Sequence, residues 1–126
     1  MSEKSATTYT VLHMRLKLRV PPDVFLAKSR EAAAVIAAVE GLIWKIWILH
    51  QEELEMGGMY LFANRDTAEA YLNDPIVQAL RSNPAVVSTE SQLWDVGSSL
   101  SAITRAPLRD VRVQSSKTEA VFAGGQ

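Results

Sequence analysis

The sequence contains no cysteine, which excludes disulfides, a thiolate nucleophile, an iron–sulfur cluster and a cysteine-ligated zinc. Histidine is scarce too, because His13 and His50 are the only two. Neither belongs to a His-x-x-x-His motif, and the chain has no acidic calcium-binding loop. We therefore expect no metal site in this protein.

An excess of charge of one sign is also missing. The chain has 13 Lys and Arg residues against 14 Asp and Glu residues, a formal net charge of -1, so nothing in this balance favours nucleic acid as a partner. No apolar run approaches the ~20 residues that span a bilayer, and the first residues do not resemble a signal peptide. The sequence thus predicts a cytoplasmic protein with no membrane association, and its length of 126 residues fits one domain.

Residues 9–19 alternate between apolar and polar side chains, which predicts a strand with one face on a hydrophobic layer. Asp23 is placed to cap a helix over residues 25–39, where alanines and larger apolar residues recur near helical spacing, and Gly41 ends that helix. The strand's apolar face carries Leu12, Met14, Leu16 and Leu18, and its polar face carries His13, Arg15, Lys17 and Arg19.

Two aromatic-rich runs, residues 41–50 and 57–62, are separated by the acidic segment 51–56. Their β-branched and aromatic content, with glycines at the return, predicts a β-hairpin. The hairpin gathers Trp44, Trp47, Tyr60 and Phe62. In so small a chain this cluster is either the centre of the core or the lining of a pocket for a flat apolar ligand.

The second half of the chain predicts two short helices and a last strand. A turn at residues 64–66 precedes a helix over 67–72, Asp74-Pro75 starts another, and residues 82–84 end it. Residues 86–96 suit a strand with Val86, Trp94 and Val96 on one face. A short helix at 98–103 follows.

This order is that of a ferredoxin-like βαββαβ fold, an α+β fold with a four-stranded antiparallel sheet and helices on one face. We assign residues 9–104 to this domain, residues 1–8 to a flexible N-terminus and residues 105–126 to a C-terminal tail or arm.

The second strand is apolar on both faces. Leu42, Trp44, Ile46 and Ile48 share one parity, and Ile43, Trp47 and Leu49 share the other with Lys45 as the only polar member. Monomers rarely expose such a patch, so we expect a twofold homodimer formed through the open face of the sheet. The basic row of the first strand would lie at its rim or pair with Glu90 and Asp95.

The segments Leu12-His-Met, Gly41-Leu-Ile-Trp-Lys-Ile-Trp, Gly57-Gly-Met-Tyr-Leu-Phe, Ala70-Tyr-Leu and Asp95-Val resemble the YdhR-like mono-oxygenase family. The resemblance runs from about residue 9 to about residue 104. It implies a dimeric α+β barrel. It also implies kinship with small oxygenases that use no flavin, haem or metal and act with O2 on electron-rich aromatic substrates.

An oxygenase without a cofactor needs a base, donors for a developing oxyanion and a dry aromatic cavity. As catalytic residues we predict His13, because histidine is the side chain most often used for proton transfer near neutral pH, and Tyr60. As substrate-binding residues we predict Trp44, Trp47, Phe62 and Trp94. Because Trp44 and Trp47 differ in parity, a regular strand cannot bring both into one cavity.

Simpler roles compete with these assignments. His13 would equally suit the polar face of its strand, and Trp94 would equally suit the core. Three functions remain open for this chain. It is an oxygenase of a small hydrophobic aromatic or quinol-like molecule, a non-catalytic protein that binds such a molecule, or an isomerase-type proton-transfer enzyme on the same fold.

Overall fold

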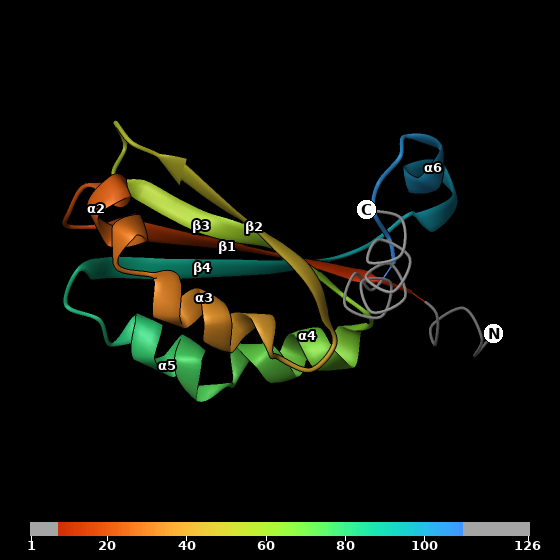
Figure 1. The fold of residues 1–126 in the computed structure, drawn as a ribbon, viewed down its shortest axis with the longest axis horizontal. Coiled ribbons are helices and arrows are strands. Elements are labelled where there is room, and N and C mark those ends of the chain that lie inside the picture. Colours follow the sequence, from red (N-terminus) through yellow and green to blue (C-terminus); the bar gives the residue numbers. More distant parts are fainter. Residues whose placement is uncertain (1–7, 110–126) are drawn as a thin grey trace, which may run out of the picture.

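The computed structural model describes residues 8–109, so most of the predicted flexible N-terminus and of the tail lies outside the described part. Figure 1 shows the strands crossing the molecule with α3, α4 and α5 along one side of the sheet and α6 at one end. The elements are β1 (Thr10–Leu18), α2 (Pro22–Ala27), α3 (Arg30–Ala37), β2 (Leu42–His50), β3 (Glu55–Phe62), α4 (Arg65–Leu72), α5 (Pro75–Arg81), β4 (Val86–Asp95) and α6 (Ser98–Ile103).

The four strands form one antiparallel sheet in the order β2-β3-β1-β4. This confirms the predicted α+β fold class and its ferredoxin-like order of elements. The face of the sheet covered by helices is called the helix side, and the opposite face the open side. On β1 the predicted alternation is confirmed, because Leu12, Met14, Leu16 and Leu18 are buried on the helix side.

The predicted helix over residues 25–39 is wrong in its continuity. The chain forms two helices, α2 and α3, with a break at Lys28 and Ser29. The Ser29 hydroxyl donates to the carbonyl of Phe25 at 2.9 Å, a side-chain bond to the backbone of the kind that competes with a regular helix. The N-cap is Pro21 rather than Asp23, which lies in the first turn.

Strand β2 contains a β-bulge at Ile43. Leu42 pairs with Phe62, whereas Trp44 pairs with the adjacent residue Leu61, so one extra residue of β2 lies between the two pairs. Neighbouring residues of β3 face opposite sides, and Leu42 and Trp44 therefore do so as well. The prediction that these two residues share a face was wrong.

A second irregularity separates Val86 from Trp94. The pairing of β1 with β4 shifts between Lys17 and Leu18, so Val86 pairs with Leu18 on the helix side while Trp94 pairs with Val11 on the open side. The predicted common face of Val86 and Trp94 was wrong for the same reason as on β2: a strand's parity changes at a bulge.

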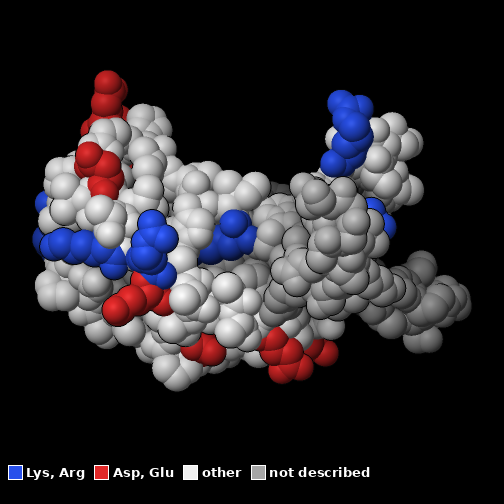
Figure 2. All heavy atoms as spheres, in the orientation of Figure 1, with Lys and Arg blue, Asp and Glu red and all other residues white. Residues whose placement is uncertain are grey.

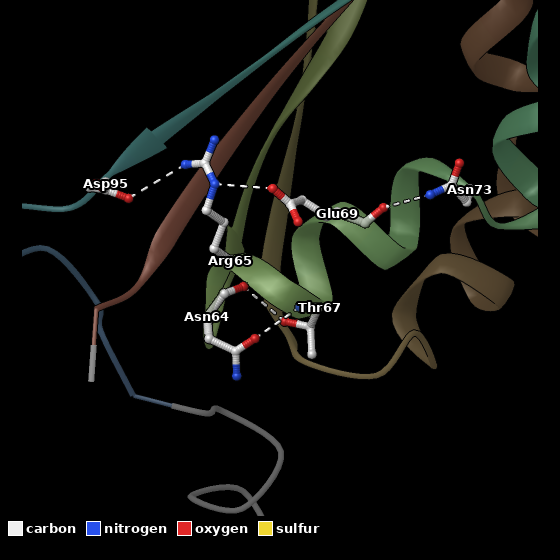
Figure 3. Close-up of polar contacts among 6 residues, drawn as sticks. All are labelled: Asn64, Arg65, Thr67, Glu69, Asn73 and Asp95. Atoms are coloured by element: carbon white, nitrogen blue, oxygen red, sulfur yellow. Dashed lines mark hydrogen bonds and ion pairs between the residues drawn. The ribbon is translucent and has the colours of Figure 1, made fainter. Parts of the chain in front are cut away.

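Helix α4 begins at Arg65, two residues before the predicted start. The Asn64 side chain accepts from the Thr67 N–H at 2.9 Å, and the Thr67 hydroxyl donates to the Asn64 carbonyl at 3.0 Å. Arg65 contacts Glu69 at 3.1 Å and Asp95 of β4 at 3.7 Å, as Figure 3 shows. The helix is thus capped and tied to the edge strand of the sheet.

Gly41 allows β2 to start against α4. Its φ is 84°, in the left-handed region, and a Cβ built there would collide with the Thr67 side chain. We expect Gly41→Ala to lower the free energy of unfolding by about 1 to 3 kcal/mol, because strain and overlap add. Urea denaturation measures this. Gly97→Ala is the matched control, since nothing lies within 4 Å of a Cβ at that position, and an equal loss in both variants would contradict the prediction.

The open side combines an ionic group with exposed apolar residues. Arg15 contacts Glu55 at 3.2 Å and Glu90 at 3.3 Å, and Lys17 lies 3.8 Å from Glu55. The predicted pairing of the basic row with Glu90 is thereby confirmed, while Asp95 contacts Arg65 instead.

The face visible in Figure 2 carries Lys and Arg interspersed with Asp and Glu, without one continuous patch of either sign.

Candidate active site

A cavity of about 440 Å³ lies between the helix side of the sheet and helices α2, α3 and α5. Its lining includes exposed residues, among them Val24 on α2, which is 43% exposed. Most of its lining is apolar. The lining residues that carry polar side-chain atoms are Lys28, Ser29, Lys45, Trp47, Tyr60, Tyr71 and Asn83.

Lys45 is a cation placed among aromatic rings. It follows the bulge on β2 and pairs with Tyr60, so its side chain lies on the helix side. Its Nζ is 3.4 Å from the centroid of the Trp47 ring and 4.6 Å from that of Tyr60. Ring faces attract a cation. Burial disfavours the charged form and lowers the pKa of Lys45 to about 7.

Gly58 makes room for the Lys45 side chain. A Cβ at this position would lie 2.5 Å from Cε of Lys45 and 3.0 Å from a ring carbon of Tyr60. The neighbouring Gly57 serves the sheet instead, because a Cβ there would collide with the Met14 carbonyl on β1. The two glycines of the hairpin thus have separate uses, one for the site and one for strand packing.

Tyr60 and Tyr71 form a pair of phenols on the wall of the cavity. Their hydroxyl oxygens are 3.2 Å apart and their ring centroids 5.1 Å apart. Burial raises the pKa of both tyrosines, so both stay protonated near neutral pH. Two hydroxyl hydrogens with one mutual bond leave one donor for a ligand, which makes the pair a hydrogen-bond donor and not a base.

No described residue that lines the cavity is Asp, Glu or His. The titratable groups that face it are Lys28, Lys45, Tyr60 and Tyr71. Lys45 therefore has no carboxylate beside it to hold its charge, and among these described groups it is the one whose pKa is shifted to the neutral range.

The structure brings together two of the six predicted site residues. Tyr60 and Trp47 both line the cavity. Phe62 is fully buried behind them, with its ring 6.1 Å from that of Tyr60 and 5.6 Å from that of Tyr71. It belongs to the core that supports the two tyrosines and is absent from the lining.

Trp44 and Trp94 lie on the open side, away from this cavity. Both line a second hollow of about 420 Å³ beside α6, where the Trp44 indole donates to the carbonyl of Pro107 at 2.8 Å. Trp94 is 55% exposed, so the reading of it as a core residue was wrong. The parity argument that separated Trp44 from Trp47 agrees with this arrangement.

The two histidines lie outside the cavity. His13 is on the open side of β1, opposite Met59 and Gln92, on the other face of the sheet from Tyr60. His50 ends β2 and is exposed. No set of three His, Cys, Asp or Glu side chains in residues 8–109 is grouped so as to hold a metal ion.

Two site residues were missed by sequence reasoning, Lys45 and Tyr71. A signal for Lys45 was present, because it is the only polar residue on its otherwise apolar strand face. Tyr71 carried no such signal, since a tyrosine in a short helix is equally suited to the core.

The lowered pKa of Lys45 predicts a pH-dependent stability. Between about 7 and 10.5 the unfolded chain binds a proton that the folded chain does not, so the free energy of unfolding rises with pH across this window. The cost of burying Lys45 is complete below pH 7 and vanishes above 10.5. We expect Lys45→Met to gain stability relative to wild type at low pH, with the gain shrinking as pH rises.

Urea midpoints of both proteins at about pH 6, 8 and 10 measure the difference in stability between Lys45→Met and wild type. The contributions of the other titrating groups are the same in both proteins and cancel in this difference. A difference that stays constant over the range would contradict the lowered pKa.

Comparison with known proteins identifies the fold class of this protein and its family. The fold is that of the dimeric α+β barrel proteins, shared at 16% identity and a TM-score of 0.57 with SnoaB, a cofactor-independent oxygenase from Streptomyces nogalater. Residues 11–107 match the family described as "Putative mono-oxygenase ydhR". The chain belongs to this family, which confirms the resemblance drawn from the sequence.

Other solved structures share the fold. The NE2512 protein of unknown function from Nitrosomonas europaea is 22% identical with a TM-score of 0.61, and the match covers 74% of this chain and 93% of that one. The match to SnoaB covers 71% and 93% of the two chains. MhuD, a heme-degrader from Mycobacterium tuberculosis with two hemes bound in its active site, is 15% identical with a TM-score of 0.55, covering 70% and 95%.

No curated protein matched the sequence. Within residues 8–109, every helix is too short or too polar to cross a membrane.

Proposed function

We propose that this protein is a cofactor-independent mono-oxygenase that acts on a planar hydrophobic aromatic or quinol-like substrate in the cavity between the sheet and the helices. The observation that carries this proposal is the position of Lys45, whose amine lies over the Trp47 ring on the same wall as the Tyr60–Tyr71 pair. Family membership and the fold shared with SnoaB support it.

The site offers the groups that such a reaction needs. Neutral Lys45 removes a proton from the substrate's phenol or activated C–H group, and the resulting ammonium then pairs with the substrate anion. The phenol pair donates a hydrogen bond to the developing oxyanion. Trp47 and the apolar walls hold the flat ring system and exclude water.

The substrate anion is the electron donor, so the chain needs only to hold it beside O2. One electron passes from the anion to O2, and the radical pair combines to a peroxide anion, which takes back the proton held by the Lys45 ammonium. The hydroperoxide then loses its remaining C–H proton together with hydroxide, as water, and leaves a carbonyl. In sum, a CH2 group and O2 become C=O and H2O, with one oxygen atom retained in the product. His13 does not enter this sequence, because it lies on the other face of the sheet.

Oxygen uptake by the purified protein, measured over a panel of anthrones, naphthols and hydroquinones, tests the proposal. Saturable uptake in wild type that persists in His13→Ala is the expected result. Uptake that is lost in a folded His13→Ala variant would restore the role predicted for His13 from the sequence. Ligand-dependent quenching of tryptophan fluorescence without uptake would favour a binding protein.

Isomerisation is a second candidate, because a neutral lysine opposite two phenol donors also suits proton transfer within one substrate. Exchange of substrate hydrogen with solvent, without oxygen consumption, would distinguish it. Haem binding of the kind named for MhuD has less support, since neither histidine lines the cavity.

We also propose that two copies associate through the open side. Its apolar residues Ile46 and Ile48 on the edge strand β2 and Trp94 on the opposite edge strand β4 are 53%, 38% and 55% exposed, and exposed apolar area on a sheet face favours an interaction surface. An isologous twofold contact would bury all of them in both copies at once.

Ile46→Glu is expected to convert the dimer to monomer, because it would bury two unpaired carboxylates in the contact. Sedimentation velocity measures the change. Val35→Glu is the matched control, because Val35 is also 53% exposed but lies on α3. A monomeric wild type, or dimers of equal stability in both variants, would contradict the proposed interface.

A further inference from the structure

The amine of Lys45 is set in a cavity that offers it aromatic faces and no counter-charge. None of the described lining residues is acidic, and Lys45 makes no ion pair within residues 8–109. Its contacts are the rings of Trp47 and Tyr60, at 3.4 and 4.6 Å from Nζ. Cation–π attraction offsets only part of the cost of removing an ammonium from water.

This arrangement favours the neutral amine, whose nitrogen lone pair is a nucleophile. Burial lowers the pKa of Lys45 to about 7, so about half of the protein carries the neutral amine at that pH. An ordinary lysine of pKa near 10.4 is neutral in roughly one molecule in 2,500 at pH 7.

We propose that Lys45 forms an imine with planar aromatic aldehydes and ketones that enter the cavity. Nζ attacks the carbonyl carbon, and the oxygen takes up a proton to give a carbinolamine. The C–O bond then breaks, the oxygen leaves as water, and nitrogen loses its remaining protons as the C=N bond forms. Amine and carbonyl compound become imine and water, with no oxidant or reductant consumed.

The surroundings select an aromatic carbonyl compound. The cavity has a volume of about 440 Å³ and a mostly apolar lining that includes Trp47 and Phe25, which suits a flat ring system. The Tyr60–Tyr71 pair has one hydroxyl hydrogen left to donate to the departing oxygen. Gly58 leaves the space that lets the amine lie across the strand. The step uses no O2, so it does not depend on the proposed oxygenase activity.

Reductive trapping tests this inference. The full-length protein is incubated under nitrogen near neutral pH with 2-naphthaldehyde and sodium cyanoborohydride, which reduces an imine to a stable secondary amine. Intact mass and peptide mapping then locate the label. We expect a naphthylmethyl group on Lys45, formed about tenfold or more faster than on Lys17 or Lys28, because the apolar cavity holds the aldehyde beside an amine whose pKa burial lowers. Peptide mapping separates this label from that on the α-amino group, which also reacts near neutral pH.

Two variants and a competitor make the result specific. Lys45→Met should lose the fast label and Lys17→Met should keep it, Lys17 being a strand lysine on the open side with 49% of its side chain exposed. If Lys45→Met does not fold, Gly58→Ala takes its place in the experiment. The added Cβ would displace the Lys45 side chain, so labelling of Lys45 should slow. 2-Methylnaphthalene, which lacks the carbonyl, should slow labelling by occupying the cavity.

Labelling of Lys45 no faster than that of Lys17 and Lys28, or labelling unaffected by 2-methylnaphthalene, would overturn the inference. Oxygen uptake is measured separately, so an oxygenase that forms no imine and an imine-forming protein that takes up no oxygen are both recognisable.

Discussion

Replacing Lys45 with methionine is expected to lower the turnover of oxygen uptake by at least about 100-fold, the usual contribution of a positioned acid–base group. Methionine keeps an unbranched apolar stem against Trp47 and removes only the amine. The substrate then retains its stacking surface but loses its base and its counter-ion. Turnover should therefore fall far more than affinity, which tryptophan fluorescence reports.

Lys17→Met is the matched control for this prediction, because Lys17 also lies on a strand but points to the open side. It should keep wild-type turnover. A folded Lys45→Met variant with near wild-type turnover would remove Lys45 from the mechanism, and His13, His50 and solvent would remain as bases.

The pH profile adds an independent readout. Because the neutral amine is the active form, turnover in the enzyme–substrate complex should rise through about pH 7, the shifted pKa of Lys45. Substrate ionisation is followed in solution over the same range, so that a rise due to the substrate alone is recognised.

Phe62→Ala is expected to lower the free energy of unfolding by about 3 to 5 kcal/mol, as is usual for truncating a buried phenylalanine. Phe62 is 0% exposed and packs against both Tyr60 and Tyr71. The loss combines the transfer of the ring with the void that it leaves. Urea denaturation, analysed for an unchanged m-value, measures it.

Trp47→Ala is the comparison that distinguishes a residue that supports the fold from one that binds the ligand. Trp47 lines the cavity and is only partly buried, so its removal should weaken ligand binding more than it lowers stability. Phe62→Leu, which keeps most of the volume, should lose much less stability than Phe62→Ala. If Phe62→Ala abolished ligand binding without loss of stability, the substrate-binding role predicted from the sequence would stand.

Much of the fold could be predicted because the hydrophobic pattern is regular on β1, a central strand of the sheet. Residues 12–18 of β1 alternate between apolar and polar side chains without interruption, and β1 is flanked by both β3 and β4. The glycines and the acidic turn marked the hairpin, although β3 begins at Glu55 and so includes two residues that had been assigned to the loop. At the break between α2 and α3 the Ser29 hydroxyl donates to the Phe25 carbonyl, and the apolar periodicity of residues 25–39 gives no sign of this break.

The site was harder to predict, because it depends on register. Trp47 and Tyr60 share a face only because Trp47 pairs with Gly58 and Lys45 with Tyr60. Counting along either strand alone does not give this pairing. The sequence shows Lys45 as the polar residue on an otherwise apolar strand face. Its lowered pKa could not be predicted, because it depends on the aromatic rings around the amine and on a described lining without acidic residues.

The bulge at Ile43 has a consequence for how this strand can be altered. The residues beyond it alternate between the cavity, with Lys45 and Trp47, and the open side, with Trp44 and Ile46. Deleting Ile43 would join Leu42 directly to Trp44 and leave both pairs, Leu42 with Phe62 and Trp44 with Leu61, as they are, so the two sets would keep their faces. If the strand instead ran regularly through Ile43, with Ile43 opposite Leu61, Trp44 and Ile46 would face the cavity and the Lys45 amine would lie in water. The one unpaired residue at the bulge therefore determines which side chains of β2 bind the ligand and which lie on the open side.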